Sequence, residues 1–88
     1  MMHLSSTKLD ILYKLWRNRC FGRGHMLIEN VLRGFPRDKL DEFRRDIKEL
    51  VREGILLMKP TNHGDAVFIN PAKRIMIRDL LRKYYEFL

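Results

Sequence analysis

The segment from Leu50 to Pro71, LVREGILLMKPTNHGDAVFINP, constrains the fold most, because several structural signals follow one another directly in it. A charged helical stretch ends at Gly54, a residue type that readily takes the left-handed conformation found after helices. Two short apolar runs follow, separated by a polar turn around Gly64. Asn70 then favours the start of a new helix. The segment predicts a β-hairpin between two helices. The predicted strands are residues 55–59 and 66–70, with a loop over 60–65.

Three amphipathic helices are predicted before this hairpin, since apolar residues recur there at helical spacing. The first is capped by the polar residues 5–7 and ends at the glycine-rich stretch CFGRGH. The second covers residues 25–32, because a residue that precedes proline is pushed out of helical geometry. The third covers residues 37–53 and follows Pro36. A last helix begins at Pro71 and runs to the C-terminus.

The order helix, helix, helix, strand, strand, helix resembles the winged helix-turn-helix domain. Within it, FRRDIKELVREGIL resembles the recognition-helix signature of MarR- and ArsR-type bacterial and archaeal transcriptional regulators. The residues at the expected places of that signature are Phe43, Ile47, Leu50, Gly54 and Ile55. The resemblance implies a mainly α fold with a small β-hairpin, of the α+β class, in a single domain over residues 1–88. It also implies double-stranded DNA binding, with the helix around 37–53 in the major groove and the wing around 55–70 on the backbone.

Charge on the third helix is segregated. The chain has a net charge of +7 and a pI near 10.0, which favours a polyanionic partner. On a helical wheel the basic flank holds Arg37, Arg44, Lys48 and Arg52, and the acidic flank holds Asp38, Glu42, Asp46, Glu49 and Glu53. Like charges four residues apart destabilise a helix. The segregation therefore suggests that the basic side contacts an anion and that the acidic side contacts basic groups elsewhere. A merely solvated face is the alternative, since Arg45 can pair with Asp41 or Glu49.

These charges define the predicted DNA contacts. The third helix is expected to enter the major groove and to contact bases or phosphates with Arg37, Arg44, Arg45 and Lys48. Arg19 and Arg23 precede the second helix in a stretch without acidic residues and are expected to hold phosphates. On the wing, Lys59 and His63 are expected at the backbone or the minor groove. A lone histidine at a hairpin tip is more often an ordinary polar turn residue, which is the alternative for His63.

The last helix bears on oligomeric state. Its apolar face is wider than one small core needs, and MarR- and ArsR-type regulators form two-fold dimers through terminal helices. We therefore predict a homodimer in which residues 71–88 form the contact. The predicted interface residues are Leu80, Leu81, Tyr84, Tyr85 and Leu88. The alternative is that this helix packs within the monomer against Leu12 and Trp16.

Other classes of function find little support. A single cysteine, Cys20, excludes an internal disulfide, and with His25 it lacks the third ligand or orienting carboxylate that a metal or nucleophilic site needs. We expect no enzyme activity, no cofactor and no small-molecule effector. The absence of a long apolar run or a signal-peptide core favours a cytoplasmic protein without a membrane partner. The main alternative is a winged-helix module that binds proteins, through the acidic side of the third helix and the C-terminal aromatic residues, without DNA contact. RNA binding is a weaker alternative, because exposed aromatic residues for base stacking are not evident.

Overall fold

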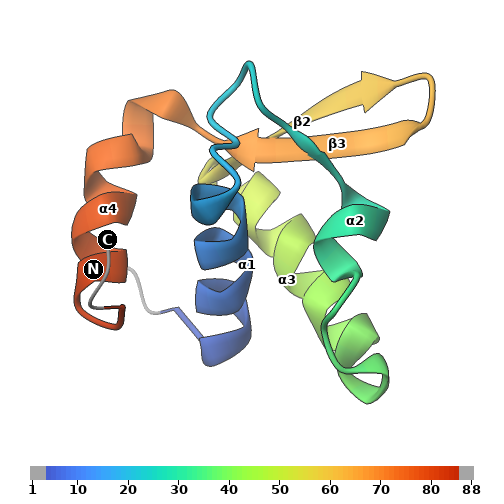
Figure 1. Ribbon diagram of the computed structural model, residues 1–88, viewed down its shortest axis with the longest axis horizontal. Helices are drawn as coiled ribbons and strands as arrows, with labels where there is room; N and C mark the ends of the chain where they lie inside the picture. Colours follow the sequence, from blue (N-terminus) through green and yellow to red (C-terminus); the bar gives the residue numbers. More distant parts are fainter. Residues whose placement is uncertain (1–3, 86–88) are drawn as a thin grey trace.

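A computed structural model of the chain describes residues 4–85 and shows a small α+β domain (Figure 1). Its helices are α1 (Ser6–Arg17), α2 (Ile28–Leu32), α3 (Leu40–Arg52) and α4 (Arg74–Arg82). Its strands are β1 (Met26–Leu27), β2 (Leu56–Thr61) and β3 (Gly64–Ile69). The short 3-10 helices η1 (Arg37–Lys39) and η2 (Pro71–Lys73) lead into α3 and α4.

The three strands form one antiparallel sheet in the order β1-β3-β2. Leu56 pairs with Ile69 at the base of the β2–β3 hairpin, and Thr61 pairs with Gly64 beside its two-residue turn. The strands are longer at the turn than predicted, so the expected loop over 60–65 shrinks to the two residues between Thr61 and Gly64. Pro60 is tolerated in β2 because this strand lies at an edge of the sheet.

Strand β1 is an element that the sequence analysis did not predict. Met26 and Leu27 pair with Val67 and Ala66 of β3, so they are extended where a helix from residue 25 was expected. Helix α2 consequently begins at Ile28. The apolar character of the segment was read correctly, but pairing with a strand some forty residues later decides its conformation.

The core lies between the sheet and helices α1, α3 and α4. Helix α1 is central and contacts the other two helices and β3 (Figure 1). The fully buried side chains include Ile11, Leu12 and Leu15 of α1, Ile47 and Leu50 of α3, Ile69 of β3, and Ile77 and Leu81 of α4. The apolar positions predicted for the third helix at Phe43, Ile47 and Leu50 are therefore confirmed.

Asn70 joins the hairpin to α4 and confirms the predicted cap. Its Oδ1 accepts a hydrogen bond from the amide of Ala72 at 3.0 Å, and its Nδ2 donates to the carbonyl of Gly54 at 2.9 Å. One side chain thus caps η2 and fixes the loop after α3. Within residues 4–85, no helix has the length and apolar character needed to cross a bilayer.

Candidate nucleic-acid interface

The acidic flank of α3 faces α1. The hydroxyl of Thr7 donates a hydrogen bond to the carboxylate of Asp46, and both side chains are buried. Lys8 Nζ lies 2.8 Å from Glu49 Oε2 and 3.7 Å from Glu53 Oε1. The expectation that the acidic side meets basic groups elsewhere in the chain is therefore confirmed for Glu49 and Glu53.

The Lys8–Glu49 ion pair changes the pKa of both partners. The hydrogen bond to Glu49 raises the pKa of the Lys8 ammonium despite the opposing effect of burial. The same bond lowers the pKa of the Glu49 carboxyl. The contact between α1 and α3 is thus electrostatic at its edge and apolar at its centre.

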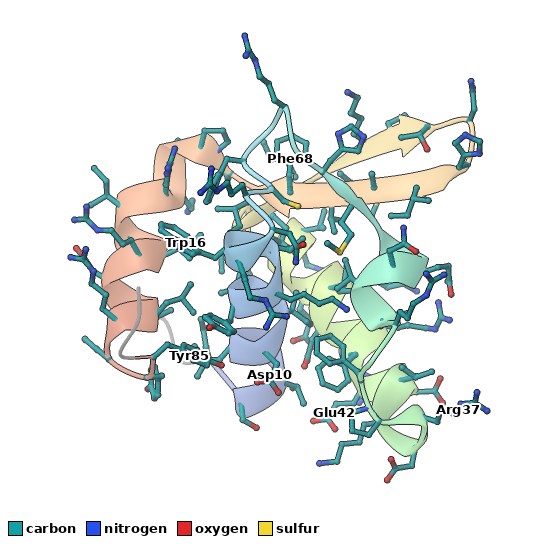
Figure 2. The ribbon with its side chains drawn as sticks, viewed as in Figure 1. Asp10, Trp16, Arg37, Glu42, Phe68 and Tyr85 are labelled. Atoms are coloured by element: carbon teal, nitrogen blue, oxygen red, sulfur yellow. The ribbon has the colours of Figure 1, made fainter. Side chains whose placement is uncertain are left out.

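The basic flank of α3 faces outward. Arg45, Lys48 and Arg52 are exposed, and none of the three forms an ion pair within the described residues. Arg37 is exposed in η1, at the free end of α3, where it points away from the body of the molecule (Figure 2). These four cations, three on α3 and one on η1 before it, are therefore accessible to a ligand.

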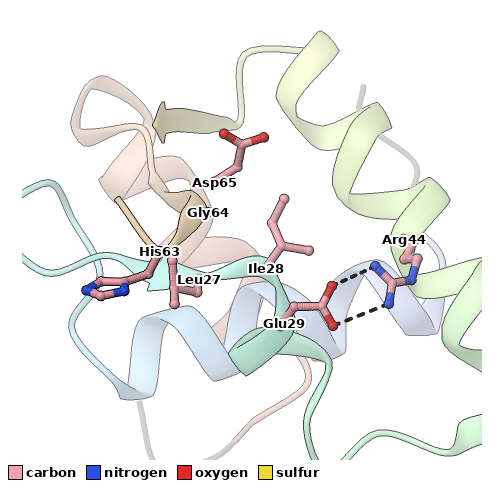
Figure 3. A pocket seen from close by; sticks show the side chains of 7 residues that line it. All are labelled: Leu27, Ile28, Glu29, Arg44, His63, Gly64 and Asp65. Atoms are coloured by element: carbon pink, nitrogen blue, oxygen red, sulfur yellow. Dashed lines mark hydrogen bonds and ion pairs between the residues drawn. The ribbon is translucent and has the colours of Figure 1, made fainter. Parts of the chain in front are cut away.

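Arg44 is the exception on this flank, because it is paired with Glu29 of α2. Its Nη1 lies 2.9 Å from Oε1 and its Nη2 3.4 Å from Oε2 of that carboxylate (Figure 3). The bond lowers the pKa of Glu29 and raises that of Arg44. Glu29 was not predicted as a partner of Arg44, since the two residues lie on different helices and no spacing rule connects them.

The Arg44–Glu29 pair lines an open hollow of about 240 Å³ between α3 and the hairpin turn. Its remaining lining comes from Leu27, Ile28, His63, Gly64 and Asp65 (Figure 3). The structure thus brings His63 of the predicted wing to the same hollow as Arg44 of the predicted recognition helix. Lys59 lies exposed on β2, across from Ala66.

Arg19 and Arg23 lie away from this surface. Their loop is fixed at the base of the sheet, where the carbonyl of Cys20 accepts a hydrogen bond from the amide of Ile69 at 2.8 Å. Ile69 ends β3, and Gly64 beside the hairpin turn begins it. A six-residue strand spans about 20 Å. The part of the loop that carries Arg19 therefore lies about one strand length from the hairpin turn.

Most residues predicted for a dimer interface pack within the monomer instead. Leu81 is fully buried and Leu80 is half-buried against the core. Tyr85 stacks on Tyr13 with ring centroids 4.0 Å apart, and its hydroxyl donates to Asp10 at 3.4 Å (Figure 2). Burial chiefly raises the pKa of Tyr85. This packing is the monomer alternative, and it leaves Tyr84, which is 61% exposed, as the accessible member of the set. Leu88 lies outside the described residues.

The side chains considered for chemistry are not assembled into a site. Cys20 is buried, and burial raises the pKa of its thiol, which disfavours the reactive thiolate. His25 is exposed on the loop before β1. Among residues 4–85, no three histidine, cysteine or acidic side chains lie close enough together to hold a metal ion.

No known protein family matches this chain, and no curated protein or solved structure is significantly similar to it. Functional assignment therefore depends on the arrangement of charge on α3, the hairpin and the loop that carries Arg19 and Arg23.

Proposed function

We propose that this chain is a cytoplasmic winged helix-turn-helix domain that binds double-stranded DNA and acts in transcription control. The order α1, β1, α2, α3, β2, β3, with a sheet order of β1-β3-β2, supports the proposal, as does the resemblance of residues 43–56 to MarR- and ArsR-type recognition helices. In a helix-turn-helix the second helix lies in the major groove. Helix α3 takes that role here, with the β2–β3 hairpin as the wing.

The observation that carries the proposal is the division of charge across α3. Asp46, Glu49 and Glu53 of its acidic side contact Thr7 and Lys8 of α1, whereas Arg45 and Lys48 face outward without an ion pair among residues 4–85. A helix with like charges in a column is stabilised when an anion lies against that column. Arginine pairs with guanine edges in the major groove, and lysine contacts phosphate or guanine. Arg45 is the principal base-reading residue of this proposal.

The test is fluorescence anisotropy of a labelled mixed-sequence duplex, titrated at low and at moderate salt. The wild type is expected to bind with an affinity that falls steeply with salt, because bound phosphates release counterions. Lys48→Ala is expected to flatten the slope of log affinity against log salt by about one unit. Arg82→Ala, which removes an exposed cation near the end of α4, is the matched control and is expected to bind like the wild type. Failure of the wild type to bind at low salt, or equal losses for the two variants, contradicts the proposal.

A dimer fits the same proposal. Two copies related by a two-fold axis would present two α3 helices to successive major-groove segments of a pseudo-palindromic site. The accessible apolar side chains of the α4 region are Ile75, Met76 and Tyr84. Sedimentation equilibrium of the wild type and of Ile75→Glu tests this part, with a shift towards monomer expected for the variant and an unchanged mass contradicting it.

The protein-binding alternative has lost part of its predicted surface. It required the acidic side of the third helix and the C-terminal aromatic residues to be free. Glu49 instead pairs with Lys8, and Tyr85 stacks on Tyr13. DNA binding is therefore the function that this geometry supports best.

A further inference from the structure

The excess positive charge of the chain lies away from α3. Residues 37–53 hold six basic and six acidic side chains and so carry no net charge. Residues 11–28 hold four basic side chains and no acidic one, and residues 66–78 hold three basic side chains and no acidic one. These two stretches together contain seven cations, as many as the net charge of +7. A polyanion is thus attracted most strongly to the surface that these two stretches form.

The fold places the two stretches side by side. The guanidinium carbon of Arg74 lies 4.2 Å from the ring centroid of Phe21 and 5.9 Å from that of Trp16. Trp16 and Phe21 pack edge to face at 5.0 Å, and Trp16 lies between α1 and α4 (Figure 2). The loop after α1 is therefore clamped to the start of α4. We call this surface the basic face. It consists of Arg17, Arg19, Arg23, Lys73 and Arg74.

The cations of the basic face have no acidic partner among the described residues, although Arg17 lies over the ring of Tyr13 and Arg74 over that of Phe21. None of the five pairs with an acidic side chain among residues 4–85. Two nearby cations are excluded from the definition because they are occupied. Lys14 donates to the carbonyls of Asn30 and Val31 at the end of α2, and Arg78 pairs with Asp79.

Arg19 stands at a backbone position that favours glycine. Arg19 has a φ of 55° and follows the last turn of α1, with hydrogen bonds from its amide to Trp16 and from Cys20 to Leu15. Gly54 has a φ of 75° and holds the same place after α3, with the same pattern of bonds. Glycine is the residue favoured at this place because a Cβ atom is strained there. An exposed arginine at position 19 therefore opposes the local preference of the backbone.

The loop presents its arginines in a fixed geometry. A Cβ atom on Gly24 would lie 2.4 Å from the carbonyl oxygen of Arg19, so the loop closes tightly on itself. The amide of Gly22 donates to the carbonyl of Gly24 at 3.1 Å, and Cys20 is bonded to Ile69. Preorganised groups lose little conformational entropy when they bind. Arg19 and Arg23 thus lie on a tight turn whose backbone is fixed by hydrogen bonds.

We propose that the basic face binds the phosphate backbone of a second DNA duplex, so that one protein bridges two duplexes. Cations spread over several elements suit an extended polyanion. The rings of Trp16 and Phe21 are engaged by Arg74, so they do not offer the free aromatic platforms on which single-stranded bases stack. Binding at the basic face stands on its own observations, whereas bridging rests on the proposed function of α3.

The first experiment measures duplex binding and thermal unfolding of Arg19→Gly. This variant removes the charge and places the favoured residue at the strained position. We expect its melting temperature to rise while the salt slope of duplex binding falls by about one unit. A rise in melting temperature together with weaker duplex binding shows that the variant lost a contact with DNA and not its structure. Unchanged duplex binding by Arg19→Gly combined with Arg23→Ala overturns the proposal.

The second experiment measures bridging. An immobilised duplex is loaded with protein, and capture of a second, dye-labelled duplex is recorded. The wild type and the control Arg82→Ala are expected to capture it, whereas Arg19→Gly with Arg23→Ala is expected to lose capture and keep the immobilised duplex. Full capture by the double variant overturns the inference and leaves the function of α3 standing. Loss of duplex binding in the double variant, with unchanged binding in Lys48→Ala, supports binding at the basic face and overturns the role of α3. Binding of the basic face to phosphatidylserine vesicles but not to a duplex overturns the inference.

Discussion

The outward side of α3 and the basic face are both rich in arginine, but their charges are held differently. On α3, Arg44 is paired with Glu29, and Arg45 lies one helical turn from Asp41 and Glu49 of the same helix. On the basic face no acidic side chain pairs with its five cations among residues 4–85. Residues 37–53 as a whole carry no net charge, so contacts of α3 with a duplex depend on where its outward cations are placed. An unbalanced surface binds any phosphate backbone. The difference suggests selective contacts at α3 and sequence-independent contacts at the basic face.

The largest expected effect comes from breaking the α1–α3 contact that orients the surface of α3. Asp46→Ala leaves the buried hydroxyl of Thr7 without its partner. We expect a loss of about 2 kcal/mol in the free energy of unfolding, as for a hydrogen bond to a charged group. Urea denaturation measures it. Asp41→Ala, at an exposed position of the same helix, is the control and is expected to change stability by less than about 0.5 kcal/mol. Equal stability of the two variants contradicts the proposed role of Asp46.

The next effect concerns the ends of α1 and α3. Because Arg19 stands at a position that favours glycine, Arg19→Gly is expected to stabilise the fold by about 1 kcal/mol. The mirror change, Gly54→Arg, is expected to destabilise it by a similar amount, since nothing crowds position 54 and only backbone strain is added. Thermal unfolding of both variants compares the two helix ends directly. A loss of stability in Arg19→Gly shows that the arginine is held for the fold.

A smaller effect on binding is expected from releasing Arg44. Glu29→Gln removes the carboxylate that holds this guanidinium and makes the surface more positive. Affinity for mixed-sequence duplex is expected to rise, and its salt slope to steepen by about one unit. Glu42→Gln makes the same charge change on the other flank of α3 and is the control. An equal gain in both variants indicates a general charge effect with no special place for the Arg44–Glu29 pair.

The smallest effect is a change in the pH dependence of stability. Because Lys8 lowers the pKa of Glu49 in the folded chain, their pair stabilises fully above the unfolded-state pKa of about 4.3 and is lost as the pH falls through the lower folded value. The raised pKa of Lys8 matters at alkaline pH. Its contribution to stability is full below the unfolded-state pKa of about 10.4 and is lost as the pH rises through the higher folded value. Glu49→Gln is therefore expected to lose less stability than the wild type between neutral pH and pH of about 3. Parallel pH profiles contradict this.

Local signals in the sequence predicted much of the fold. Gly54 and Asn70 mark helix boundaries through their own backbone or side chain, and the buried face of α3 follows from helical spacing. Strand β1 was missed because two residues carry no periodicity and their conformation depends on β3. Whether α4 packs on α1 or on a second copy could not be decided from a helical wheel, which shows a face but not what covers it.

The candidate site was less accessible from the sequence. The wheel separated the two flanks of α3, and the structure adds that Lys8 pairs with Glu49 and Glu53 on the acidic one. The pairing of Arg44 with Glu29 and the contact of Arg74 with Phe21 join different elements, so neither follows from spacing along the chain. Arg19 and Arg23 were expected to hold phosphates of the duplex that α3 contacts, because the order of elements does not show which end of the sheet their loop joins.

A two-dimensional ¹⁵N–¹H NMR titration of the full chain with a short duplex tests the two-surface account most directly. At low duplex concentration we expect amide shifts in residues 44–52 of α3 and around the hairpin turn at 62–64. A second set is expected in residues 17–24 and 73–74, and salt should weaken this set more. Shifts confined to one of the two surfaces would remove the other from the account. The absence of shifts at both, with duplex in excess at low salt, would contradict it altogether.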